Sequence, residues 1–449
     1  MARMKSDTQI GDQDHARDGF SNPERAGVIF ENVLMAAPRI RGRQASNPQR
    51  SMTKEYDMNV FEKSIWPSFT EEEAQAVADI VRSNRVNYWT GQVGRAFEQE
   101  FARWVGTEHA VALANGTLAL DVALKALGIG SGDEVIVTPR TFIASISCVV
   151  NAGAVPIFAD VDRNSGNISP ATIAPLISER TRAIIPVHLA GWPCDMDGIM
   201  DLAAQHDLAV IEDCAQAHGA MIGDRSVGSI GHIGAWSFCQ DKIMTTGGEG
   251  GMVTTNDKSL WSAMWSFKDH GKSWEAIYER EHAPGFRWVH ESIGTNWRML
   301  EMQAAIGRIQ LNHIADWTQR RTEIATRLSE ALARHPAVVR VPVPAAGLRH
   351  AYYRLYGYVR PEGLAIAWSR DRIVAALNEA GVQVLHGTCP EVYLEKAFDN
   401  TAYRPATRLP NARDLGETSL MFLTHPTMGD VELDHAVNAI DAVLTAAAR

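Results

Sequence analysis

The chain has 449 residues, and at roughly 100–200 residues per domain this length indicates two or three domains. Apolar residues make up 45% and charged residues 21%, a composition typical of a globular enzyme. The sequence has no fixed-period repeat, which argues against collagen-like, coiled-coil and repeat proteins. The 43 basic and 53 acidic residues leave a net charge of −10. This acidity disfavours binding to nucleic acid or to anionic membranes, since both depend on positive charge.

The cysteines and the apolar runs indicate a cytoplasmic protein. No apolar run approaches the ~20 residues that a membrane span needs, and residues 1–50 lack the apolar core of a signal peptide. The cysteines are odd in number and form no Cys-x-x-Cys pair, which argues against a disulfide framework or a zinc site. His386 and His425 also lack metal-ligand spacing, so we expect no metal site.

Residues 1–58 differ in composition from the rest. They mix Arg, Asp, Gly, Ser, Asn and Gln, with one short apolar patch at Val28–Met35. We therefore predict a mostly disordered extension. It is either a flexible leader, a stretch upstream of a true start at Met52, or a docking arm.

From Ile65 onward, buried strands alternate with amphipathic helices. Thr70 precedes three glutamates, a typical helix start. The expected strands are His109–Leu113, Glu134–Val137, Val155–Ala159, Ala183–Val187, Ala209–Ile211 and Ala235–Phe238. Helical segments such as Ile173–Ile177 and Met196–Gln205 lie between them. This alternation predicts an α/β fold with a mainly parallel sheet and helices on both faces. Ligands of such sheets bind at the carboxyl ends of the strands.

The pattern changes after Asn312. A charged helix at Ile314–Ala333 leads into short strands, and the chain ends in a helix at Val431–Ala447. We therefore predict a large domain at residues 59–312 and a smaller α/β domain at residues 313–449.

The first motif is the turn at Ala114–Thr117, which follows a strand and precedes a helix. The N-terminus of a helix exposes free N–H groups, so Gly116 and Thr117 are candidates for holding a phosphate. The alternative is an ordinary N-cap. The glycines at residues 128–132 follow a helix instead of a strand, so they indicate a turn and not a dinucleotide loop.

Two further motifs follow expected strands. Glu212 and Asp213 end one strand, where a carboxylate would keep a facing ring nitrogen protonated, or would simply cap the strand. Ser237 and Lys242 follow another strand and precede a glycine-rich loop at residues 247–251. A lysine held in a cleft has a lowered pKa and a nucleophilic amine. The alternative is an exposed lysine beside a hairpin.

Taken together, the motifs supply an anion cradle, an acid for a pyridine nitrogen and an amine for a Schiff base, the parts that a pyridoxal phosphate site requires. From about Trp66 to the C-terminus the sequence resembles the DegT/StrS family of pyridoxal-phosphate-dependent sugar aminotransferases, which have the fold type I architecture. The matching segments include residues 115–117, 130–137, 153–158, 186–191, 212–216, 237–242, 247–251 and 294–305.

The resemblance implies a role for each matching residue. Lys242 is expected to bind the cofactor as a Schiff base and to transfer protons, and Asp213 to face the pyridine nitrogen. Phe142 is expected to stack on the ring, and Gln216 to lie near its phenolic oxygen. The residues expected to hold the phosphate are Gly116, Thr117 and Ser237, together with Asn296 and Arg298 contributed from a neighbouring subunit, which implies a homodimer.

Other residues have two interpretations. His188 either lines the substrate cleft or is a hydrogen-bonded core histidine. Arg140 stands where small residues are usual in the family, and it either meets a substrate carboxylate or phosphate or makes a surface contact. Leu189 and Ala190 stand where many relatives have an aromatic residue, so the sugar pocket is expected to differ.

The implied activity is transfer of an amino group from an amino acid, L-glutamate by resemblance, to a keto-sugar linked to a nucleotide, for amino-sugar and surface polysaccharide synthesis. A sugar dehydratase of the same fold is an alternative, but such relatives carry His in place of Lys242. A second alternative is a non-catalytic regulatory protein that binds the cofactor.

Overall fold

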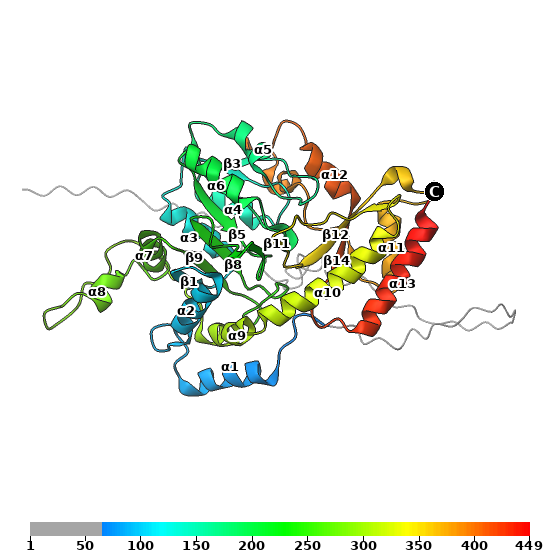
Figure 1. Cartoon of the computed structure of the whole chain (residues 1–449). Helices are drawn as coiled ribbons and strands as arrows, with labels where there is room; N and C mark the ends of the chain where they lie inside the picture. The colour runs from blue at the N-terminus through cyan, green and yellow to red at the C-terminus, as the bar shows by residue number, and fades with distance from the viewer. Residues whose placement is uncertain (1–64) are drawn as a thin grey trace, which may run out of the picture. The chain divides into compact units, whose positions relative to one another are not determined.

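A seven-stranded sheet forms the centre of the larger part of the molecule in the computed structural model, which describes residues 65–449 (Figure 1). The predicted disorder of residues 1–58 falls outside this range. In spatial order the strands are β1 (His109–Leu113), β9 (Gly251–Thr255), β8 (Ile233–Ser237), β5 (Ala209–Asp213), β4 (Thr181–Ile185), β2 (Glu134–Val137) and β3 (Val155–Phe158).

The neighbours from β8 to β3 run parallel, whereas β9 pairs antiparallel with both β1 and β8. The predicted mainly parallel sheet is therefore confirmed. Strand β9 was not predicted, because the glycines at residues 247–251 were interpreted as a loop. Strand β4 begins and ends two residues before its expected position, and beyond its end Val187 forms an isolated parallel bridge with Asp213 at the end of β5.

Helices cover both faces of this sheet (Figure 1). The helices of this part are α1 (Glu71–Ser83), α2 (Val93–Val105), α3 (Gly116–Ala126), α4 (Ala144–Asn151), α5 (Pro170–Ile173), α6 (Met196–Gln205), α7 (Lys258–Phe267), α8 (Trp274–Tyr278) and α9 (Glu301–Leu311). Of these, α1 packs against α9 and α8 against α7, so both lie farther from the sheet (Figure 1). Strand residues alternate between the two faces. Val111 packs with α3, α4 and α7, while its neighbours Ala110 and Ala112 pack with α2. Thr70 caps α1 and forms a capping box with Glu73, as the sequence predicts.

A second sheet lies in the C-terminal third of the chain. Its order is β10 (Val339–Arg340), β12 (Arg354–Val359), β14 (Ser419–Leu423) and β13 (Val384–Leu385), all antiparallel. Helices α10 (Ile314–Ala333), α11 (Arg370–Glu379) and α13 (Asp430–Ala447) cover it, with a core built wholly from residues 324–447. A small third sheet joins β11 (Leu348–Arg349) to β6 (Met221–Ile222) and β7 (Arg225–Ser226).

The predicted division between residues 312 and 313 stays a prediction. The core of the second sheet is separate, which agrees with a smaller domain. Helix α12 (Pro410–Thr418), however, buries Ala412 and Leu415 in the core beside β2 and β4 of the large sheet. Within residues 65–449, no helix combines the length and apolar character that a membrane crossing requires.

Candidate active site

The carboxyl ends of the strands and the start of α3 bring together residues far apart in sequence. Asn115 caps α3, since its side chain accepts a hydrogen bond from the Leu118 N–H at 3.0 Å. The N–H groups of Gly116 and Thr117 lie in the first turn, where no helical carbonyl is available to them. A Cβ on Gly116 would lie 2.5 Å from the Ser237 Cβ and 2.9 Å from its Oγ. The turn and the Ser237 hydroxyl therefore form one cradle.

Asp213 ends β5 as a buried carboxylate. Its Oδ2 accepts a hydrogen bond from the Ser145 hydroxyl at 2.7 Å, and its Oδ1 accepts one from the Ala215 N–H at 3.1 Å. Ser145 in turn lies 3.0 Å from the Thr141 hydroxyl. Among residues 65–449, Asp213 forms no ion pair with a cationic side chain. A buried carboxylate without a cation is costly unless a positively charged group binds beside it.

Lys242 lies in the loop after β8 and is partly buried. Its backbone carbonyl accepts a hydrogen bond from the Trp66 indole at 2.8 Å, which fixes the loop. Its Nζ lies 5.2 Å from the centre of the Tyr353 ring, on the segment leading into β12. The amine therefore lies between the two parts of the molecule that carry the two larger sheets.

The electrostatics of Lys242 differ from the expectation. Burial lowers the pKa of the Lys242 amine, but neighbouring groups, first Tyr353 and then Asp241, raise that pKa by more, so it lies above its usual value. The prediction of a lowered pKa for Lys242 is therefore wrong, because the electrostatic effect of Tyr353 and Asp241 is larger than the effect of burial. The contact with Tyr353 was not predictable from the sequence, because Tyr353 lies more than 100 positions from Lys242.

Phe142 and Gln216 flank the same edge of the sheet. The Phe142 side chain is 64% exposed, a high value for a phenylalanine, and it stands one residue after Thr141. Gln216 is buried, and its Oε1 accepts a hydrogen bond from the Ala190 N–H at 2.7 Å. An open aromatic face and a fixed amide agree with the expected contacts to a flat ring, and these roles stay predictions.

The segment at Asn296–Arg298 runs beside the cradle. The Ala114 N–H donates to the Trp297 carbonyl at 3.0 Å, so this segment lies next to the start of α3. Asn296 is exposed, whereas Arg298 donates to the buried Asp269 of its own chain at 2.7 Å. Asn296 is therefore free to reach another subunit, while Arg298 is held within its own.

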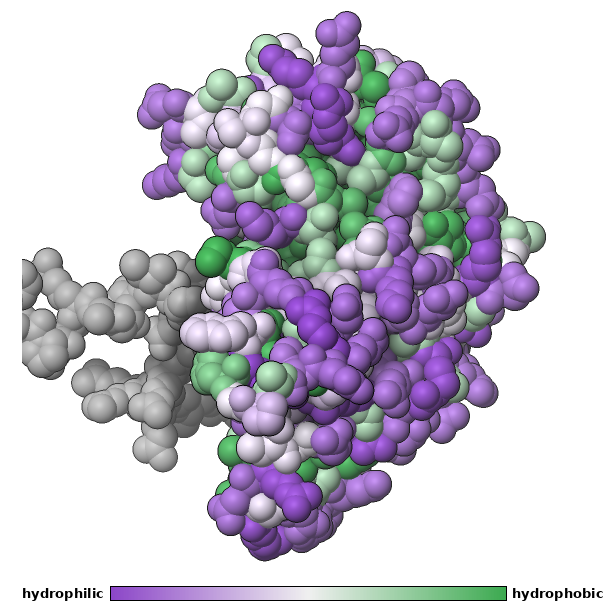
Figure 2. Space-filling model, turned by 90° about the vertical axis from the view of Figure 1, so that its left-hand side faces the viewer, coloured by the Kyte–Doolittle hydropathy of each residue, from purple (hydrophilic) through white to green (hydrophobic). Residues whose placement is uncertain are grey.

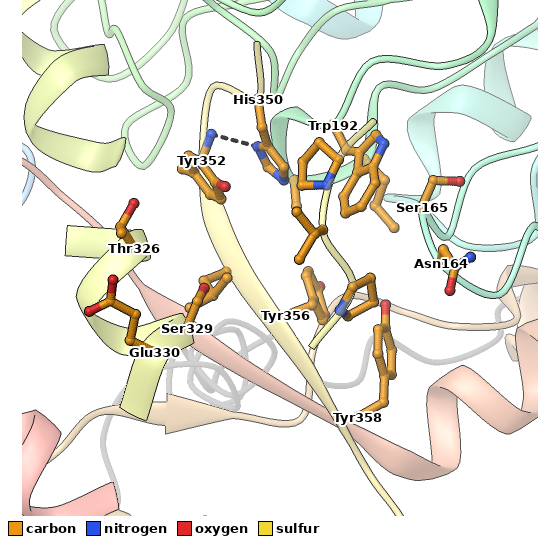
Figure 3. Close-up of a pocket in the computed structure, with 16 residues that line it drawn as sticks. Asn164, Ser165, Trp192, Thr326, Ser329, Glu330, His350, Tyr352, Tyr356 and Tyr358 are labelled. Atoms are coloured by element: carbon orange, nitrogen blue, oxygen red, sulfur yellow. Dashed lines mark hydrogen bonds between the residues drawn. The ribbon is translucent and has the colours of Figure 1, made fainter. Parts of the chain in front are cut away.

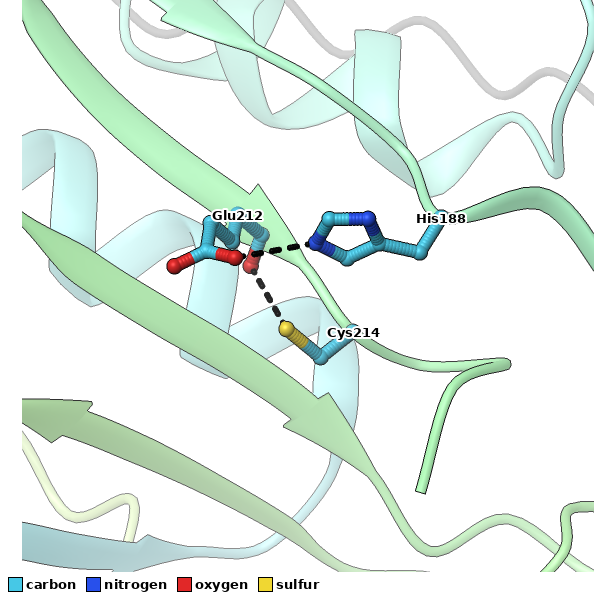
Figure 4. Close-up of side chains that lie close together, drawn as sticks. All are labelled: His188, Glu212 and Cys214. Carbon is cyan, nitrogen blue, oxygen red and sulfur yellow. Dashed lines mark hydrogen bonds and ion pairs between the residues drawn. The ribbon is translucent and has the colours of Figure 1, made fainter. Parts of the chain in front are cut away.

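The structure places His188 in the buried core. It has no exposed surface, its Nε2 lies 3.0 Å from Glu212 Oε2, and its Nδ1 accepts from the Cys194 N–H at 3.0 Å (Figure 4). The substrate-lining role of His188 is wrong, and the core-histidine alternative describes it. Both ring nitrogens are used, so none is free for a ligand.

Glu212 holds this part of the core together. It accepts three backbone N–H groups, from Gly228, Ile230 and Gly231, in addition to His188, and these partners lower its pKa although burial alone would raise it. Donor atoms of His188, Glu212 and Cys214 lie within 4.8 Å of one another (Figure 4). Burial raises the pKa of the Cys214 thiol, so it stays protonated. These contacts describe a hydrogen-bonded core cluster.

Arg140 is neither exposed nor in a surface contact, so that alternative is wrong. The side chain is buried, with 1% of the residue exposed, and Nη1 donates to the Tyr358 hydroxyl at 3.0 Å. Its guanidinium carbon lies 4.8 Å from the Tyr356 ring centre and 5.5 Å from that of Tyr358. This burial was not predictable from the sequence, because both tyrosines come from the second sheet.

Comparison with known proteins decides the family. The model of the DegT/DnrJ/EryC1/StrS aminotransferase family matches residues 67–441. The chain belongs to this family. It is 36% identical over 386 residues to the spore coat polysaccharide biosynthesis protein SpsC of Bacillus subtilis, covering 85% of this chain and 96% of SpsC. It is 37% identical over 359 residues to GDP-perosamine synthase of Caulobacter vibrioides, covering 79% of this chain and 92% of that enzyme.

Solved structures of family members agree with the fold. An aminotransferase from Psychrobacter cryohalolentis is 62% identical, with a TM-score of 0.84 over 85% of this chain and 98% of that one. DesV of S. venezuelae, solved with a ketimine intermediate, is 33% identical, with a TM-score of 0.74 over 83% of this chain and 94% of DesV. The chain is thus a sugar aminotransferase family member of fold type I, an enzyme class whose cofactor is pyridoxal phosphate.

The residues present fit this cofactor. The cradle at Gly116 has free N–H groups and is so close to Ser237 that a Cβ would fill it. Within residues 65–449, Asp213 is a buried acid that forms no ion pair, which suits a carboxylate that faces a protonated ring nitrogen. Lys242 supplies an amine at the same edge of the sheet.

Proposed function

We propose that this enzyme transfers the amino group of L-glutamate to the carbonyl of a nucleotide-linked keto-sugar, as a step in the synthesis of amino sugars for a surface polysaccharide. The observation that carries the proposal is the grouping of the Gly116–Ser237 cradle, Asp213 and Lys242 at one edge of the sheet. The names of relatives support the acceptor class, since they include GDP-perosamine synthase and a UDP-N-acetyl-3-dehydro-α-D-glucosamine 3-aminotransferase.

Two side chains, Asp213 and Lys242, divide the chemical work. When bound, pyridoxal phosphate supplies an electron-accepting ring. Asp213, fixed by Ser145 and the Ala215 N–H, holds a proton on the nitrogen that faces it. The Lys242 amine removes a proton from the Cα of the donor and returns it at a neighbouring carbon, and the Trp66 indole holds the loop that carries this amine. Because the pKa of Lys242 is raised, its amine must first give up its own proton before it can accept one from the donor.

The proposal includes a homodimer that shares its active sites and works in the cytoplasm. Asn296 is exposed next to the cradle. Between α7 and α9 the large apolar side chains of Phe286, Trp288 and Ile293 are also exposed. Figure 2 views the side of the molecule that carries α7 and α8, and it shows apolar side chains gathered in a hollow among polar ones. A second copy that packs here would cover these side chains.

Lys242 argues for transamination over the alternative of sugar dehydration, since the dehydratases resembling this chain carry His at this position. One relative, 32% identical, bears the name pleiotropic regulatory protein, which matches the second alternative by name only. The intact grouping of Lys242, Asp213 and Ser237 supports catalysis.

The test begins with enzyme loaded with pyridoxamine phosphate. Nucleotide-linked keto-sugars are added one at a time, and the visible absorbance of the aldehyde form of the cofactor is followed. The proposal expects the aldehyde form to return with at least one of them, and L-glutamate to restore the amine form with release of 2-oxoglutarate. If no keto-sugar restores the aldehyde form although the enzyme binds the cofactor normally, the proposed acceptor class is contradicted.

A further inference from the structure

The Lys242 amine lies against the face of an aromatic ring. Its Nζ is 5.2 Å from the centre of the Tyr353 ring. A cation over the face of an aromatic ring, within about 6 Å of its centre, is attracted by the negative charge density of that face. A neutral amine gains much less from the same place. The ring therefore favours the protonated form of Lys242 and gives it a defined position.

The Tyr353 ring is fixed relative to the loop that carries the amine. Only 6% of the residue is exposed, and it belongs to the same core cluster as Phe238 and Ile243, which lie on either side of Lys242 in the chain. Its hydroxyl donates to the carboxylate of Asp241, one residue before Lys242. The ring and the amine are thus held by the same short loop.

The rings that precede Tyr353 in the chain face a different space. His350 and Tyr352 stack with their centres 4.0 Å apart and their planes 5° from parallel, and both line a cavity of about 200 Å³ beside Trp192 (Figure 3). The Tyr352 N–H donates to His350 Nδ1 at 2.8 Å, and the left-handed backbone of Tyr352, with φ of 46°, turns the chain before Tyr353. These rings therefore line the cavity, whereas Tyr353 lies against the amine.

Asp241 and Arg354 complete the surroundings of the ring. The Arg354 guanidinium carbon lies 4.0 Å from the ring centre, and its Nη1 donates to the Tyr353 carbonyl at 2.8 Å. Its Nη2 lies 3.5 Å from Asp241 Oδ2, the same oxygen that accepts the Tyr353 hydroxyl. The carboxylate therefore stands beside two cations, Arg354 and the Lys242 ammonium, and it favours the charged form of both.

The other titratable groups that act on Lys242 do not take the place of this ring. Cys239 is a neutral thiol, because burial raises its pKa. Burial lowers the pKa of His218 to about 3, so this side chain is neutral at pH 7. Asp213 is the acid assigned above to the ring nitrogen of the cofactor. The aromatic ring and the carboxylate beside it are left for the amine.

We propose that Tyr353 is a positioning residue of the reaction: the face of its ring, with the Asp241 carboxylate beside it, holds the Lys242 ammonium between the steps in which this amine acts. The inference rests on the proposed function, which makes Lys242 the reacting amine. Once Lys242 has taken the Cα proton of the donor it is an ammonium, and the ring holds it until that proton is returned at the neighbouring carbon.

The experiment measures the protonation of Lys242 in enzyme loaded with pyridoxamine phosphate, in which this amine is free. Acetic anhydride in trace amounts reacts with the unprotonated amine. Its rate of reaction at Lys242 is measured from pH 6 to pH 10 by mass spectrometry of the peptides, with the exposed Lys258 on α7 as internal reference. The midpoint of this pH profile is compared between the wild type, Tyr353→Met, Tyr353→Phe and Asp241→Ala. A change in access to the amine alters the rate at every pH and leaves the midpoint in place.

Tyr358→Met is the matched control. Tyr358 is also buried, with 4% of the residue exposed, and its ring centre lies 4.7 Å from the guanidinium carbon of Arg340. Its hydroxyl, however, contacts Arg140 instead of the Lys242 loop. The rate of the L-glutamate half-reaction, with hydrogen or deuterium at Cα, is recorded for each variant on the pyridoxal phosphate form.

The midpoint for Lys242 should fall by about 0.5–1 pH unit in Tyr353→Met, which is roughly a threefold to tenfold gain in free amine at neutral pH. Asp241→Ala should lower it similarly, because an opposite charge is lost. Tyr353→Phe keeps the ring and should change the free amine less than about twofold, and Tyr358→Met should match the wild type. The L-glutamate half-reaction of Tyr353→Met should nevertheless slow about tenfold, with a larger deuterium effect, because the amine is no longer placed for proton transfer.

An unchanged midpoint in Tyr353→Met or in Asp241→Ala overturns the inference, as does an equal fall in Tyr353→Phe or in Tyr358→Met. A normal half-reaction in Tyr353→Met with a lowered midpoint overturns it too. The Asp241 side chain is 56% exposed, so Asp241→Ala decides the matter if Tyr353→Met does not fold. The labelling requires neither an amino donor nor a keto-sugar, so the inference can fail while the proposed function stands, and the reverse.

Discussion

Replacing Gly116 with alanine tests the cradle at the start of α3. The added Cβ would lie 2.5 Å from the Ser237 Cβ, 2.9 Å from its Oγ and 3.0 Å from its Cα, and real Cβ atoms do not approach so closely. Either the first turn of α3 or strand β8 must move. Overpacking of this kind costs about 1–3 kcal/mol of folding stability. It also moves the N–H groups that hold the phosphate away from the Ser237 hydroxyl.

The assay is titration of the apo-enzyme with pyridoxal phosphate, followed by absorbance, with thermal unfolding of the apo-enzyme as the stability measurement. Gly116→Ala should bind the cofactor about tenfold to a hundredfold more weakly, which corresponds to roughly 1.4–2.8 kcal/mol. Gly130→Ala is the control, since its Cβ would meet only the Ala152 carbonyl, at an ordinary 3.6 Å. It should bind like the wild type.

A double variant separates packing from binding. Adding Ser237→Gly to Gly116→Ala removes the two nearest atoms of the clash, so part of the lost stability should return. Cofactor affinity should not return, because the Ser237 hydroxyl is gone as well. Wild-type affinity in Gly116→Ala, or full recovery of affinity in the double variant, would refute the cradle.

Three further predictions concern charge. Asp213→Asn keeps an acceptor for the Ser145 hydroxyl but loses the negative charge. In steady-state kinetics kcat/KM should therefore fall about a hundredfold or more, and circular dichroism should show an unchanged fold. Glu212→Gln places an amide against backbone N–H donors and should lower the free energy of unfolding by about 3 kcal/mol or more in urea titration; an unchanged midpoint would contradict its structural role. Burial lowers the pKa of His218 and of His350 to about 3, so between pH 6.5 and pH 3 the unfolded state binds more protons. Stability should therefore fall as the pH drops below 6.5, and a flat melting temperature from pH 7.5 to 5 would count against this burial.

Local patterns in the sequence predicted most of the large sheet and its helices. Strands β1 and β2 and helices α6 and α10 have the expected bounds, because buried runs and amphipathic periods are set by neighbouring residues. Strand β9 was missed, since its pairing with β1 and β8 depends on distant partners. The glycines before it also favoured a loop.

The site shows the same division. Asp213 and Lys242 were identified because each follows a buried strand, and the order of strands sets their shared edge. The surroundings of Arg140 and the pKa of Lys242 were not predictable, since Tyr356 and Tyr358 lie in strand β12 of the second sheet and Tyr353 directly precedes that strand. His188 was ambiguous for a related reason. Its ring nitrogens are taken by Glu212 and by a backbone N–H that only the fold brings near.

The central claim is that the ε-amine of Lys242 is the group that binds pyridoxal phosphate covalently. Reduction of the cofactor-loaded enzyme with borohydride, followed by protease digestion and mass spectrometry, measures this directly. The claim predicts that the reduced cofactor is attached to the peptide carrying Lys242, and that Lys242→Ala gives no labelled peptide. Labelling of a different lysine, or of none in an enzyme that still turns over, would contradict it.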